Sequence, residues 1–157
     1  MHPHTVHLTL RLTHEVNDPS TVTHLLELIP TRALQANQAI QLNGATGKVK
    51  RSAWILSSEE HVDSTDLDDH LHWMMDQLTD RRERILSLND SGWSIALNVM
   101  WDSQIGHGGP VLPPRILRWM SDIGATLEVD SYFIGAYLAI RRNTQFFGGE
   151  CVGMEEL

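Results

Sequence analysis

Apolar and polar residues alternate along two stretches of this chain, and each alternation predicts a β-strand. Val6, Leu8, Leu10 and Leu12 alternate with threonine, histidine and arginine residues, as expected of a strand with one buried face. The second alternation runs from Trp93 to Trp101. Further strands are expected over residues 52–57 and from Leu127 to Phe133. Within the 52–57 strand, we expect Trp54 to project away from Ile55 and to cover the other side of the sheet.

Three helices are predicted between these strands. Asp18-Pro19 is a helix start, because aspartate caps a helix and proline suits its first turn, and Pro30 ends that helix. Pro113-Pro114 starts another helix, which ends near Gly124. A longer helix from Thr65 or Asp66 to about Leu88 joins the two parts. Its predicted buried stripe is Leu67, Leu71, Met74, Leu78 and Ile85.

Two strand-helix-strand halves joined by a long helix predict an α+β fold. We expect a four- to five-stranded sheet with helices mainly on one face, a ferredoxin-like variant, because cleanly alternating strands have one buried face. Each half is expected to form a right-handed crossover, with an irregular hairpin within residues 31–51. A mostly parallel sheet is the alternative, since the long helix can carry the chain back across the sheet.

Length and composition favour one domain. The chain has 157 residues, of which 41% are hydrophobic, enough for one domain with a core. We place this domain at residues 1–142 and a flexible tail at 143–157, where no period persists. Cys151 is the single cysteine, which fits a reducing compartment. The start lacks a secretory signal, and no stretch is long enough to span a membrane, so we expect a cytoplasmic protein without membrane contact.

The chain is acidic, with a formal net charge of −8 from 20 acidic and 12 basic residues. This charge argues against nucleic acid as a direct ligand, because binding phosphates needs a concentrated basic patch. An acidic surface can attract a basic protein partner. A modest negative charge is also ordinary for a soluble protein.

The order of several motifs resembles a known family. The threonine-leucine-arginine strand precedes an Asp-Pro helix that ends in Pro30-Thr31-Arg32. The segments Trp54-Ile55-Leu56-Ser57-Ser58, Asp66 to Leu78, Trp101 to Gly109 and Asp130-Ser131-Tyr132 follow. Together they resemble the bacterial family catalogued as domain of unknown function 4279, over roughly residues 6–134. The resemblance implies a compact bacterial domain and no known catalytic residues.

No motif of the chain carries a recognised chemistry. His70 and His72 are about 200° apart around a helix and therefore do not form a metal-binding pair. We expect neither a metal nor a cofactor. The loop at residues 106–110 contains His107 between glycines, and it is either a ligand-contacting loop or only the connection to the next helix. Arg32 and neighbouring basic residues are a candidate anion contact.

Trp73 is the residue that the predicted core leaves unexplained. On the long helix it falls on the polar side with Asp66 and Asp69. An exposed tryptophan among charges is a frequent binding hot spot. Alternatively, a loop or the tail covers it.

These observations favour a non-catalytic protein-binding module, either an immunity or antitoxin-like protein or a homodimer, with Trp73, Asp66 and Asp69 in its surface. The alternative is a small-molecule-binding protein or enzyme whose site near residues 106–110 uses His107 and Arg32.

Overall fold

The computed structural model describes residues 5–42, 44–103 and 108–133. In chain order the elements are β1 (Thr5–His14), α1 (Ser20–Leu26), β2 (Arg32–Leu34), β3 (Ala39–Leu42), β4 (Ala45–Lys48), β5 (Ser52–Ser57), α2 (Leu67–Leu78), the 3-10 helix η1 (Thr79–Arg81), α3 (Arg82–Asp90), β6 (Ser94–Ser103), α4 (Pro114–Asp122) and β7 (Thr126–Phe133). The predicted tail at 143–157 and His107 lie outside the described residues.

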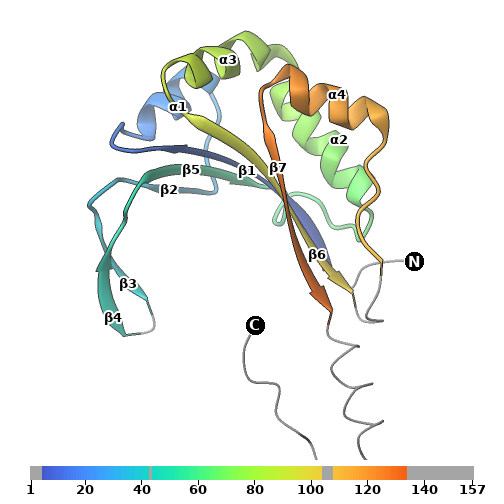
Figure 1. Ribbon diagram of the computed structural model, residues 1–157, viewed down its shortest axis with the longest axis horizontal. Helices are drawn as coiled ribbons and strands as arrows, with labels where there is room; N and C mark the ends of the chain where they lie inside the picture. Colours follow the sequence, from blue (N-terminus) through green and yellow to red (C-terminus); the bar gives the residue numbers. More distant parts are fainter. Residues whose placement is uncertain (1–4, 43, 104–107, 134–157) are drawn as a thin grey trace, which may run out of the picture.

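A five-stranded sheet with the strand order β2-β5-β1-β6-β7 is the centre of the fold. β1 is antiparallel to both of its neighbours, β5 and β6, whereas β7 is parallel to β6. All four α-helices lie on one side of this sheet, and the β3–β4 hairpin extends from its other side (Figure 1). The predicted α+β fold, with helices mainly on one face, is confirmed.

Four of the five strands follow the β-α-β-β-α-β plan of ferredoxin-like folds. β2 is antiparallel to β5, and β5 is antiparallel to β1. β2 therefore runs parallel to β1, with β5 between them and α1 as the crossover. The segment from α2 to α3 is the second crossover, from β5 to β6. α4 and β7 extend this plan by one parallel strand at the edge.

The expected pairing within the first half of the chain was wrong. We expected the strands at residues 6–12 and 52–57 to be connected as a crossover unit, but β5 is the antiparallel neighbour of β1, with Leu12 opposite Trp54. The parallel partner of β1 is β2, only three residues long. The inserted β3–β4 hairpin precedes β5, which returns antiparallel between β2 and β1.

The hydrophobic core lies between the sheet and the helices. Trp54 belongs to it and has 0% exposure, so our expectation that it covers the other side of the sheet was wrong. Its register with Leu12 places it on the helix-covered face, and its Nε1 donates a hydrogen bond to Thr23 Oγ1 of α1 at 3.0 Å. Trp93 and Trp101 are also buried on this side, as their alternation predicted.

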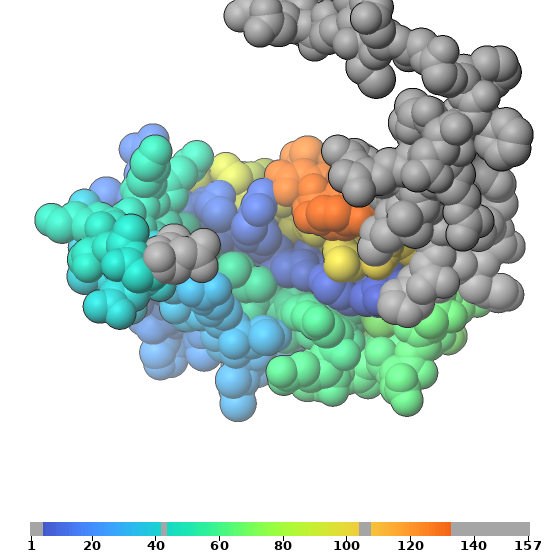
Figure 2. Space-filling view, turned by 90° about the horizontal axis from the view of Figure 1, so that it is seen from below, coloured from blue at the N-terminus to red at the C-terminus, as the bar shows by residue number. Residues whose placement is uncertain are grey.

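No described helix packs on the opposite face of the sheet (Figures 1 and 2), and polar residues of β1, β6 and β7 pair with one another there. Arg11 of β1 reaches across β6 to Glu128 of β7, with an N···O distance of 2.7 Å to one carboxylate oxygen. Next to this ion pair, Asn98 donates to Asp130 at 2.9 Å. These contacts show two of the places where polar residues that alternate along the strands pair with one another.

The predicted long helix is divided into α2, η1 and α3. Thr79 Oγ1 donates to the carbonyl oxygen of Met75 at 2.8 Å, a contact that often bends a helix. Arg81 then binds the carbonyl oxygens of Gln77 and of Leu26, the last residue of α1. The bend directs α3 over α1. None of the helices in the described ranges is long and apolar enough to cross a membrane.

Candidate protein-binding surface on helix α2

The negative charge of the chain is concentrated in one segment. Eight of the 20 acidic residues lie between residues 59 and 80, and this segment has no lysine or arginine. The other twelve acidic residues equal the 12 basic residues of the whole chain. The formal net charge of −8 is therefore located in the β5–α2 connection, in α2 and in the first residues of η1.

Helix α2 separates its apolar and acidic residues cleanly. Leu67, His70, Leu71, Met74 and Leu78 are buried against the core. Asp66, Asp68, Asp69, Asp76 and Asp80 are exposed along α2 and at its two ends. We call the exposed residues Asp66, Asp69, Asp76 and Asp80, together with Trp73, the acidic α2 surface. Among the described residues, none of these four carboxylates forms an ion pair.

Trp73 is half-buried and packs against the edge of the core. It follows the buried His70 by three residues, so its large ring reaches the margin of the buried stripe. The ring of His61, from the β5–α2 connection, stacks on it with a centroid distance of 4.8 Å and an interplanar angle of 12°. Of the two alternatives for Trp73, the structure thus shows partial cover by a loop residue. Its role in binding stays a prediction.

Asp66 and Asp69 both hold the start of α2. Asp66 is the N-cap, and its Oδ1 accepts a hydrogen bond from the backbone N–H of Asp68 at 3.0 Å. Asp69 Oδ2 accepts from the hydroxyl of Ser64 at 2.6 Å. Both carboxylates remain exposed, so a partner can still approach them.

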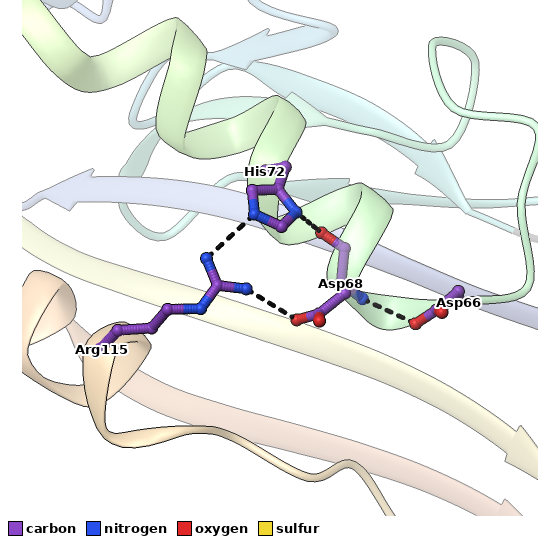
Figure 3. A network of polar contacts seen from close by, with 4 residues as sticks. All are labelled: Asp66, Asp68, His72 and Arg115. Carbon is purple, nitrogen blue, oxygen red and sulfur yellow. Dashed lines mark hydrogen bonds and ion pairs between the residues drawn. The ribbon is translucent and has the colours of Figure 1, made fainter.

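On the side of α2 that faces α4, an arginine of α4 binds two side chains of α2. Arg115 of α4 donates to His72 Nε2 at 2.9 Å and forms an ion pair with Asp68 Oδ1 at 3.3 Å (Figure 3). His72 Nδ1 lies 2.8 Å from the carbonyl oxygen of Asp68. Arginine only donates and a carbonyl only accepts, so in these contacts Nε2 is the acceptor from Arg115 and Nδ1 is the donor to Asp68. The contact of Arg115 could not be predicted from the sequence, because Arg115 lies 43 residues after His72 in the chain.

A buried serine-histidine pair holds the connection before α2. The Ser58 hydroxyl accepts a hydrogen bond from the backbone N–H of Leu8 at 2.9 Å and lies 2.7 Å from His70 Nδ1. His70 Nε2 donates to the carbonyl oxygen of Ser64 at 2.9 Å. Ser58 has 0% and His70 1% exposure. A serine nucleophile must reach its substrate, so this pair is structural. The position of His70 within the apolar stripe was the sequence signal for its burial.

A pocket of about 460 Å³ lies beside this connection. Its walls come from the start of β1 and from the residues between β5 and α2. They are Thr5, Val6, His7, Glu59, Val62, Asp63, Ser64 and Thr65. Ser64 joins the pocket to the acidic α2 surface, because its side chain binds Asp69. Nothing in the sequence pattern predicted this pocket.

Arg32 and the 106–110 loop are not brought together by the described geometry. Arg32 is exposed on β2, and three strand spacings, about 14 Å, separate β2 from β6. In the register Arg32 is level with Ala96, and β6 continues for about 23 Å to Ser103 before the connection to α4 begins. The described residues contain no group of three side chains that can hold a metal ion.

Comparison with known families now places the chain. Residues 4–134 match the family described as Domain of unknown function (DUF4279). The chain belongs to this family. The matched range contains all of the elements from β1 to β7, so the whole described fold is the DUF4279 domain.

DUF4279 membership confirms the family that the motif order resembled, and it leaves the activity open. No curated protein and no solved structure matches the chain. The acidic α2 surface and the pocket are therefore the features of this DUF4279 domain from which a function has to be argued.

Proposed function

We propose that this protein is a non-catalytic binding module that recognises a basic protein through the acidic α2 surface. The observation that carries the proposal is the location of the net charge: the whole formal excess of −8 lies within residues 59–80. A concentrated patch of one sign steers a partner of the opposite sign and selects against others.

The Trp73–His61 stack adds the apolar component that a charged surface lacks. Rim charges alone contribute mainly to the association rate. Binding energy usually comes from a few aromatic or arginine residues near the centre of an interface. Trp73 lies beside Asp66, Asp69 and Gln77 on adjacent turns, and its half-exposed ring leaves area for a partner to bury.

The proposed partner is a bacterial protein with a basic surface, such as a toxin that acts on nucleic acid. Proteins that bind phosphates need clustered lysine and arginine, and an acidic surface complements such a cluster. An immunity or antitoxin-like role in the cytoplasm follows from this reasoning. A homodimer through the acidic α2 surface is disfavoured, because two identical acidic surfaces repel each other.

Quantitative pull-down from cells, with mass spectrometry, tests the proposal. The triple variant Asp69→Asn/Asp76→Asn/Asp80→Asn removes three charges from the acidic α2 surface. Glu15→Gln/Asp90→Asn/Asp122→Asn removes the same charge from exposed positions elsewhere. We expect the wild type and the control to retain the same basic partner, and the α2 variant to lose it. Equal recovery by both triple variants contradicts the proposal.

The alternative, a small-molecule or enzyme site with His107 and Arg32, has less support. Arg32 lies on the far edge strand, distant from the start of the connection that contains His107.

A further inference from the structure

We propose that the pocket between β1 and the β5–α2 connection receives an arginine or lysine side chain of the partner. This inference rests on the proposed function and adds where the partner is anchored. An anchor side chain inserted in a pocket is the usual centre of a protein interface, and arginine is enriched there.

The walls of the pocket suit a cationic side chain. Glu59 and Asp63 supply carboxylates, and among the described residues neither a lysine nor an arginine contributes to the lining. Both carboxylates are exposed and have no ion pair with any described residue. Val6 and Val62 offer apolar surface for the aliphatic part of a long side chain.

His7 contributes to the wall of the pocket next to the carboxylates. Its Nδ1 is buried and has no hydrogen-bond partner among the described residues, and its side chain lines the pocket. A buried polar nitrogen without a partner is unfavourable. Because this nitrogen is closed to solvent, the two carboxylates are the expected polar contacts of a cation that enters the pocket.

The pocket is held in shape from behind. Ser58 and His70 are buried, and His70 fixes the carbonyl oxygen of the pocket residue Ser64. The backbone N–H groups of His61 and Val62 both donate to the carbonyl oxygen of Ser58 at 3.0 Å. The wall is therefore ordered before a partner arrives, which lowers the entropic cost of binding.

The pocket volume and its position agree with this role. At about 460 Å³ it lies within the range of pockets that hold small ligands, about 300–1,000 Å³, and it accommodates one long side chain. Ser64 lines the pocket and also binds Asp69, so the pocket adjoins the acidic α2 surface.

Two probes of nearly equal shape test the charge requirement. N-acetyl-arginine N-methylamide carries the cation, and N-acetyl-citrulline N-methylamide is its neutral counterpart. In ¹H–¹⁵N NMR titrations of the full chain, we expect the arginine probe to shift the amides of residues 5–7 and 59–65 and the citrulline probe to leave them in place. Equal shifts from both probes would overturn the inference.

Matched variants locate the effect and separate it from the proposed function. Glu59→Gln/Asp63→Asn should weaken binding of the arginine probe about tenfold, whereas Glu15→Gln/Asp122→Asn should not change it. The pocket variant should also reduce recovery of the partner in the pull-down.

If the pocket variant binds the partner normally while the α2 triple variant does not, the pocket inference fails and the proposed function stands. If arginine binds but partner recovery never depends on the pocket, the pocket serves a free small cation and the inference is again wrong.

Discussion

The two flanks of helix α2 have similar sequences and opposite surroundings. Toward α4, Asp68 and His72 are held by Arg115 (Figure 3). Toward the β5–α2 connection, Asp66 and Asp69 hold backbone and hydroxyl groups, and Trp73 stacks on His61. Among the described residues, no lysine or arginine forms an ion pair on this second flank. An acidic composition therefore does not define a binding surface by itself, because ion pairs within the protein neutralise some of the carboxylates, as Arg115 does for Asp68.

The flank toward α4 forms contacts within the fold. The flank toward the β5–α2 connection leaves carboxylates and part of the Trp73 ring available to a partner. Substitutions on the two flanks should separate stability from binding.

Replacing His70 should cost the most stability. His70→Ala removes the side chain that binds Ser58 and Ser64 and leaves the buried Ser58 hydroxyl without this partner. We expect the free energy of unfolding to fall by about 2–4 kcal/mol. Urea denaturation measures it. His72→Ala, on the exposed side of the same helix, is the matched control and should cost less than about 1 kcal/mol. Equal losses would show that the buried network contributes nothing special.

Trp73→Ala should affect both stability and binding. The half-buried ring loses its core contacts and the stack with His61, so we expect a loss of about 1–3 kcal/mol in thermal or urea unfolding. Recovery of the partner should fall with it.

Trp119→Ala is the control, because Trp119 of α4 is also half-buried against the core. It should lower stability to a similar extent and keep the partner. If both variants bind equally well, Trp73 has no role in recognition.

The Arg115–Asp68 ion pair should be worth little. Its side chains are 43% and 51% exposed, and exposed pairs contribute about 0.2–1 kcal/mol. A double-mutant cycle with Arg115→Ala and Asp68→Ala, followed by urea unfolding, should give a coupling energy in this range that decreases with added salt. Arg115→Ala combined with Asp69→Ala should be additive. Equal coupling to Asp69 would mean that Arg115 serves both flanks.

Asp18, which lies outside α2 and before α1, should make a small contribution to the acid dependence of stability. The backbone N–H and the side chain of Ser20 donate to its carboxylate, and with the nearby His24 they lower the pKa of Asp18 below its ordinary 3.8. The charged form therefore stabilises the folded state above about pH 3.8, and this contribution disappears as the pH falls through the lower folded-state pKa. Asp18→Asn should reduce the acid dependence of unfolding slightly, and an unchanged profile would contradict this assignment.

The sequence predicted the positions of the helices and strands better than it predicted which strands are neighbours in the sheet. Alternation located β1 and β6, because a strand with one buried face has a strict period of two. β2 was missed, since its three residues are too few to show a period. Trp54 was placed on the wrong face of the sheet. The residues from Ala53 to Leu56 are all apolar, so their pattern does not indicate which of them face the core.

The candidate site was predictable only where local spacing decides it. The helical position of Trp73 placed it at the polar side, but its contact with His61 depends on the path of a loop. Arg115 and the pocket depend on elements that meet only in the folded chain. The start of α2 was predicted at Thr65 or Asp66, because helix capping is determined by neighbouring residues, and the structure shows Asp66 as the N-cap.

The central position of β1 has a consequence for synthesis on the ribosome. β1 emerges first, yet its hydrogen bonds on one side need β6, and Arg11 meets Glu128 only 117 residues later. At about 5–20 residues per second, the amino-terminal strand therefore waits for many seconds with an unpaired edge. We expect nascent chains that end before β6 to be sensitive to protease and to bind chaperones, and folding to be completed only when almost the entire domain has left the exit tunnel.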